Sequence, residues 1–92
     1  MDQEFSNRVA LVTGGSRGIG RACCVRLAQA GASVAINYAK SEKAARETFR
    51  LVEEAGVKAH VVRADVSSSE QVDAMVREIT DTLGPVDLLV NN

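Results

Sequence analysis

Short apolar runs alternate along the chain with longer segments in which apolar residues recur every three or four positions. The first spacing is typical of buried strands and the second of helices with one buried face. The pattern predicts four strands, over residues 8–12, 33–37, 58–64 and 86–90. The third run alternates more than the others and carries Lys58, His60 and Arg63, which favours an edge strand.

Three helices are predicted between these strands, each bounded by capping residues. The first runs from Gly18 to Ala30, and the second follows the N-cap Ser41 and ends at Gly56. Two overlapping capping boxes open the third helix, Ser67 with Glu70 and Ser68 with Gln71, and Gly84-Pro85 ends it. At helical spacing, the buried face of the first helix is expected to contain Ile19, Ala22, Cys23, Leu27 and Ala30.

The order β-α-β-α-β-α-β predicts an α/β fold with a parallel sheet and right-handed crossovers. The expected architecture is the first part of a Rossmann-type doubly wound sheet, with strand order 3-2-1-4. Residues 1–92 are expected to form a single, partial dinucleotide-binding domain, preceded over residues 1–7 by a polar leader that frays.

Composition narrows the function. The chain has 92 residues and a net charge of −1 without a basic block, which argues against a nucleic-acid partner. No apolar run approaches the length of a membrane span, and no signal peptide is evident, so a cytoplasmic protein without a membrane partner is expected. Cys23 and Cys24 are adjacent on a helix and point about 100° apart, so we interpret them as apolar helix residues and expect no metal site.

The glycine-rich segment Thr13–Gly20 joins the first strand to the first helix with the spacing Thr-Gly-x-x-x-Gly-x-Gly. Gly14 is expected to make the turn, Gly18 to admit phosphates, and Gly20 to let helix and strand pack closely. The helix start leaves unpaired N–H groups, among them that of Ile19, at the positive end of the helix dipole. The segment therefore predicts a pyrophosphate site, with a plain glycine-rich turn as the alternative.

The end of the second strand selects between NAD(H) and NADP(H). An acidic side chain there would bind a ribose 2′-hydroxyl and repel a 2′-phosphate, but this chain has Asn37-Tyr38. Arg17 lies in the loop, where a guanidinium can pair with a 2′-phosphate, and contacts are also expected from Ser16, Lys40 and Ser41. These residues favour NADP(H); the alternative for Arg17 is a solvated surface cation.

The chain resembles the short-chain dehydrogenase/reductase family, and within it the 3-oxoacyl-(acyl-carrier-protein) reductases. The matching segments are Thr13–Gly20, Asn37–Ala39, Ala64–Val66 and Asp87–Asn92. The resemblance implies that Asp65 and the backbone of Val66 contact the adenine, and that Asn91 supports the sheet and lines the adenosine ribose. Asp65 alternatively caps the turn into the third helix.

The family's catalytic residues have no counterpart in this sequence. The family uses an Asn, a Ser and a Tyr-x-x-x-Lys pair, whereas Tyr38, the only tyrosine, is followed by Ala39-Lys40-Ser41-Glu42. The resemblance therefore implies the cofactor-binding half of an enzyme, inactive by itself. His60, the only histidine, is expected on the surface rather than in a catalytic site.

Three functions compete at this stage. The first is the NADP(H)-binding half of an oxidoreductase that reduces a 3-oxoacyl thioester or a similar carbonyl by hydride transfer. The second is a non-catalytic nucleotide-binding or assembly module; the apolar strand Val86–Val90 would be the edge for homo-oligomerisation or another association. The third, a methyltransferase that uses S-adenosylmethionine, ranks last because it needs an acid where Asn37 stands.

Overall fold

The computed structural model describes residues 4–92 and has an α/β fold. A four-stranded parallel sheet has the order β3-β2-β1-β4, which confirms the predicted topology. The strands are β1 (Val9–Thr13), β2 (Ser33–Tyr38), β3 (Ala59–Arg63) and β4 (Leu88–Asn91). The helices are α1 (Gly18–Gln29), α2 (Glu42–Glu54) and α3 (Ser69–Thr82).

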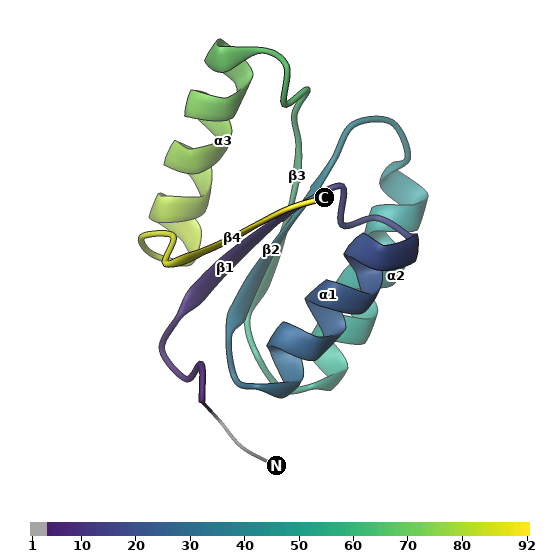
Figure 1. Cartoon of the computed structure of the whole chain (residues 1–92), viewed down its shortest axis with the longest axis vertical. Coiled ribbons are helices and arrows are strands. Elements are labelled where there is room, and N and C mark those ends of the chain that lie inside the picture. Colours follow the sequence, from purple (N-terminus) through teal and green to yellow (C-terminus); the bar gives the residue numbers. More distant parts are fainter. Residues whose placement is uncertain (1–3) are drawn as a thin grey trace.

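The helices cover the sheet from both sides, so the core has two parts. Helices α1 and α2 pack on one face and α3 on the other (Figure 1). The central strands β1 and β2 are almost entirely buried, as their continuous apolar runs require. Strand β3 lies at one edge, as predicted, and its His60 ring hydrogen-bonds Glu78 of α3.

The predicted helix N-caps form at Ser41 and Ser68, but neither predicted capping box closes. The Gln71 side-chain oxygen accepts the Asp65 N–H instead of the Ser68 N–H. The Ser41 hydroxyl accepts the Ala44 N–H at 3.1 Å, and the Ser68 hydroxyl accepts the Gln71 N–H at 3.3 Å. The predicted box of Ser67 with Glu70 does not form. Ser67 instead donates its N–H and its hydroxyl to Asp65, so one overlapping box is replaced by a local turn.

The buried face of α1 differs from the predicted one. Its buried residues are Gly20, Cys24 and Ala28, whereas Ile19 is 75% exposed and Ala22 also faces solvent. The prediction counted side-chain hydrophobicity and ignored Gly20, which brings the helix backbone against the Gly14 carbonyl in the turn after β1. Cys23 and Leu27 flank the buried face and are partly buried against the core.

The polar leader lies partly outside the described residues, which exclude 1–3. Residues 4–7 form a turn, in contrast to the expected fraying, because the Phe5 N–H donates to the Ala30 carbonyl at 2.9 Å. The same turn is closed by the Arg8 N–H, which donates to the Phe5 carbonyl. Within the described part of the chain, no helix has the length and apolar character needed to cross a membrane.

Burial makes Cys24 a test of the core. Desolvation, with a smaller contribution from neighbouring Cys23, raises the pKa of the Cys24 thiol from 9.0 to about 12. In a Cys23→Ala variant, native protein should therefore resist iodoacetamide at about pH 8, because the thiolate is the nucleophile. Mass spectrometry should show alkylation only after unfolding; rapid labelling of native protein would contradict this packing.

The same shift has a consequence for stability. The folded-state pKa lies above the unfolded value of 9.0, so the contribution of the buried thiol is complete below that value. It is lost progressively as the pH rises toward about 12.

Candidate functional site

The parallel sheet brings the carboxyl ends of its strands to one edge, where the loops into the helices gather. The loop between β1 and α1 is central there. Gly14 and Gly18 have φ of +63° and +61°, a left-handed backbone that favours glycine. A Cβ atom on Gly18 would meet no atom within 4 Å, so the loop is open to a ligand at this point.

Gly20 fixes how closely α1 approaches this loop. A Cβ atom at residue 20 would lie 2.0 Å from the Gly14 carbonyl oxygen, a distance that no side chain can occupy. Gly15 is also tightly enclosed, since its Cβ would lie 3.0 Å from the Cys24 Sγ atom and 3.1 Å from Ile36. The predicted packing role of Gly20 thus has a geometric basis, and Gly15 has one that the sequence did not reveal.

Asn37, at the end of β2, is a structural centre of the site. Its side chain is buried, accepts the Gly14 N–H at 3.3 Å and donates to the Ala64 carbonyl at 3.2 Å. Its backbone carbonyl accepts the Gly15 N–H at 2.9 Å. Asn37 therefore joins the glycine loop to β2 and to the end of β3, and its side chain faces the protein rather than the surface.

A hollow of about 400 Å³ lies between the glycine loop and the segment after β2. It is lined by Gly14, Ser16, Arg17, Tyr38, Ala39, Lys40 and Ser41. The structure thus brings together the loop and strand residues that the sequence assigned to a 2′-phosphate. Asn37 does not line the hollow but bonds Gly14, which does.

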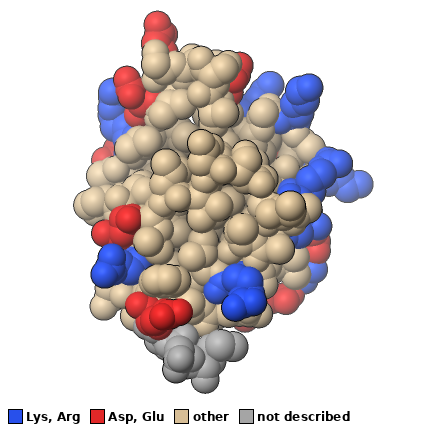
Figure 2. Space-filling view, viewed as in Figure 1, with Lys and Arg blue, Asp and Glu red and all other residues tan. Residues whose placement is uncertain are grey.

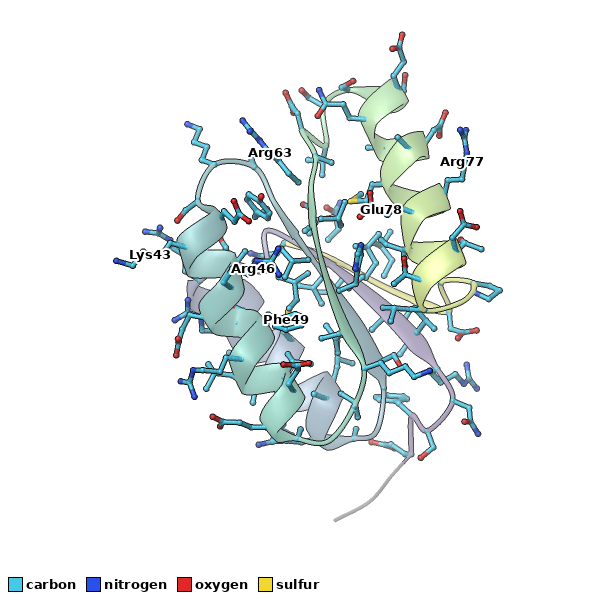
Figure 3. The ribbon with its side chains drawn as sticks, turned by 180° about the vertical axis from the view of Figure 1, so that it is seen from behind. Lys43, Arg46, Phe49, Arg63, Arg77 and Glu78 are labelled. Atoms are coloured by element: carbon cyan, nitrogen blue, oxygen red, sulfur yellow. The ribbon has the colours of Figure 1, made fainter. Side chains whose placement is uncertain are left out.

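The charge of this hollow is positive. Arg17 and Lys40 are exposed, no acidic residue lines the hollow, and neither cation has a partner within the described residues. Arg63 pairs in register with Tyr38 and adds a cation at the same edge of the sheet (Figure 3). Lys and Arg side chains also gather on the side where α2 begins (Figure 2).

The end of β4 is tied to the start of the loop by asparagines. The Thr13 hydroxyl donates to the Asn91 side-chain oxygen at 3.1 Å and accepts the Asn92 N–H at 3.0 Å. The Asn92 side-chain Nδ2 atom donates to the Gly14 carbonyl at 3.2 Å. Asn91 thus contacts β1 directly. The sequence analysis assigned no contact to Asn92, although it follows Asn91 in the matching motif and also bonds the start of the loop.

Asp65 and Val66 lie at the same edge, after β3. Asp65 caps the turn before α3, and hydrogen bonds from the Ser67 hydroxyl and N–H hold the pKa of its carboxyl below the ordinary value. Val66 is 52% exposed. The turn-capping alternative for Asp65 is therefore confirmed, and its contact with an adenine stays a prediction, as does that of Val66.

Arg21 and Thr48 were also missed by the sequence analysis. Both contact the glycine loop, because each donates a hydrogen bond to the Ser16 carbonyl. The available signal was weak: a polar residue on the inner face of each of two adjacent helices.

The loop geometry predicts unequal costs for two alanine substitutions. Gly20→Ala should lower the free energy of unfolding by about 3 kcal/mol or more, because the new Cβ collides with backbone that cannot move away. The control Gly18→Ala should cost only about 1–2 kcal/mol, since its Cβ enters open space and only the left-handed backbone is penalised. Urea unfolding measures both; equal costs would contradict the described contact.

Comparison with known proteins agrees with this geometry. The family model for short chain dehydrogenase matches residues 8–92. A Bacillus subtilis protein named short-chain dehydrogenase/reductase homolog YusS is 48% identical over 94% of this chain and 79% of its own length. The 3-oxoacyl-[acyl-carrier-protein] reductase FabG of Staphylococcus epidermidis is 42% identical, over 94% of this chain and 35% of that protein.

Solved structures show the same arrangement. A dehydrogenase/reductase from Sinorhizobium meliloti superposes with a TM-score of 0.93 at 40% identity, covering 99% of this chain and 36% of that one. A Serratia marcescens short-chain dehydrogenase/reductase gives a TM-score of 0.92 at 40% identity, covering 97% and 36%. The chain thus spans about a third of these longer proteins. On its fold, its glycine loop and these matches, the chain belongs to the short-chain dehydrogenase/reductase family.

Proposed function

We propose that the chain is the NADP(H)-binding part of a short-chain oxidoreductase. The observation that carries this proposal is the positive hollow between the glycine loop and the segment after β2. It offers two cations, Arg17 and Lys40, and two hydroxyl side chains, Ser16 and Ser41, with no carboxylate among them. This donor set suits a phosphate group.

The glycine loop supplies the site for the pyrophosphate. Gly18 leaves open space, and no side chain caps the start of α1. The first N–H groups of the helix, including those of Ile19 and Gly20, have no intrahelical acceptors. A phosphate can therefore approach these groups and the positive end of the helix dipole.

The choice of NADP(H) over NAD(H) follows from what lines the hollow. The Asn37 side chain is held by Gly14 and Ala64, so it presents nothing to the ribose. Tyr38, the neighbouring position, lines the hollow without a negative charge. Nothing there repels a 2′-phosphate, and Arg17 can pair with it. On the adenosine side, we propose contacts with Asp65, Val66 and Asn91.

The reaction would be reduction of a carbonyl, with the bound nicotinamide supplying the hydride. A 3-oxoacyl thioester is the proposed substrate class, because a 42% identical relative bears the name of such a reductase. The family's Tyr-x-x-x-Lys pattern is absent from these ninety-two residues, so we expect them to bind cofactor without turnover. We place the protein in the cytoplasm.

Arg17→Ala tests the proposed cofactor. The substitution should weaken NADPH binding by about 1.5–3 kcal/mol, the range for a hydrogen bond to a charged group, and change NADH binding little. Isothermal titration calorimetry measures both. Lys43→Ala is the matched control, since this cation is near the hollow but points into solvent (Figure 3). Equal affinity of wild type for the two cofactors, unchanged by Arg17→Ala, would refute the proposal.

Association through β4 is a second proposal. Strand β4 pairs only with β1 among the described strands, and Leu89 on it is 64% exposed. Unpaired backbone groups beside an exposed apolar side chain form a template for another strand. Leu89→Lys should therefore reduce the mass measured by light scattering, whereas Val76→Lys, at a 38% exposed position on α3, should not. A monomeric wild type, or a dimer that survives Leu89→Lys, would overturn the proposal.

A further inference from the structure

Arg21, in the first turn of α1, makes three hydrogen bonds that connect separate segments. Its Nη2 atom donates to the Ser16 carbonyl at 2.7 Å and to the Ala44 carbonyl at 2.9 Å. Its Nε atom donates to the Thr48 hydroxyl at 2.9 Å. One planar guanidinium therefore holds the glycine loop and α2 in a fixed relation.

Thr48 completes this arrangement. It is fully buried, and its hydroxyl donates to the Ser16 carbonyl at 3.0 Å while accepting from Arg21. The Ser16 carbonyl thus accepts two hydrogen bonds, one from Arg21 and one from Thr48. A trans peptide is planar, with its C=O and N–H on opposite sides, so fixing this carbonyl also fixes the direction of the Arg17 N–H.

These contacts join the two walls of the hollow. Ser16 belongs to the loop wall, and Ser41 belongs to the opposite wall, where its hydroxyl accepts the N–H of Ala44. Arg21 bonds the carbonyls of both Ser16 and Ala44. The separation of the walls therefore depends on a side chain that does not line the hollow.

The acceptors of Arg21 are all neutral. Within residues 4–92 no carboxylate forms an ion pair with it, and its side chain donates to two carbonyls and a hydroxyl. The Arg50 hydrogen bond chiefly, and the Arg21 charge to a smaller extent, lower the pKa of the Glu47 carboxyl, so Arg21 interacts electrostatically with Glu47 without a direct ion pair.

We propose that Arg21, with Thr48, is a positioning residue that sets the hollow to the width of a phosphate and thereby determines the preference for a 2′-phosphate. The inference rests on the proposed NADP(H) function. It assigns no contact between Arg21 and the cofactor. Its role is exerted through the Ser16 carbonyl, the Arg17 backbone and the start of α2.

The test compares two small ligands, adenosine 2′,5′-bisphosphate and AMP, which differ by the 2′-phosphate. Calorimetry on wild type, Arg21→Gln, Thr48→Val and the control Arg26→Gln gives the ratio of the two affinities. Arg26 is an exposed cation in the last turn of the same helix. We expect the ratio to fall by about tenfold in Arg21→Gln, to fall in Thr48→Val, and to stay unchanged in Arg26→Gln.

The melting temperature without ligand separates positioning from general stability. A purely structural role would lower the melting temperature and leave the affinity ratio of the folded protein unchanged, which would overturn the inference alone. Wild type that fails to prefer the 2′-phosphate would overturn the proposed function and the inference with it. If Arg21→Gln does not fold, Thr48→Val decides the question, because valine keeps the shape of threonine and removes the hydroxyl.

Discussion

The contact between Gly20 and the Gly14 carbonyl sets the geometry of this molecule. With hydrogen in place of a side chain at residue 20, the backbone of α1 lies directly against the turn that leaves β1. At the start of α1, backbone N–H groups rather than side chains therefore face the side where a ligand would bind. Cys24 and Ala28 follow Gly20 at intervals of four residues and so lie on the same face of α1. The close packing of Gly20 therefore also places these two side chains in the core.

Hydrogen bonds between distant segments fix the rest of the site. Asn37 joins the glycine loop to the end of β3, and Thr13 binds Asn91, the last residue of β4, and Asn92, which follows it. At the opposite end of the sheet, Asp87 makes two hydrogen bonds to Val9, the first residue of β1. Its carboxylate accepts the Val9 N–H, and its N–H donates to the Val9 carbonyl. Both ends of β1 are thus secured by polar groups, while its length is secured by apolar packing.

The sequence predicted the fold well because its signals there are local. Apolar runs, glycine stops and the serine caps at Ser41 and Ser68 each act within a few residues, and the crossover rule then orders the strands. It failed where tertiary contacts decide. The buried face of α1 depends on a glycine that hydrophobic spacing does not count, and the pairing of Arg21 with Thr48 spans two helices. The residues of the positive hollow were foreseen because they directly follow the first and second strands, whose carboxyl ends meet at one edge of a parallel sheet.

Asn37 and Tyr38 are both buried, but they differ in what they face: the Asn37 side chain is bonded to Gly14 and Ala64, whereas Tyr38 lines the hollow. A carboxylate at residue 37 would sit inside the protein, would lack the N–H that reaches Ala64, and would have little solvent to offset its charge. A carboxylate at residue 38 would instead face the hollow that holds Arg17. Any redesign of this protein toward a cofactor without a 2′-phosphate therefore has one strand position available and its neighbour closed, a division that alternation along β2 imposes on the chemistry.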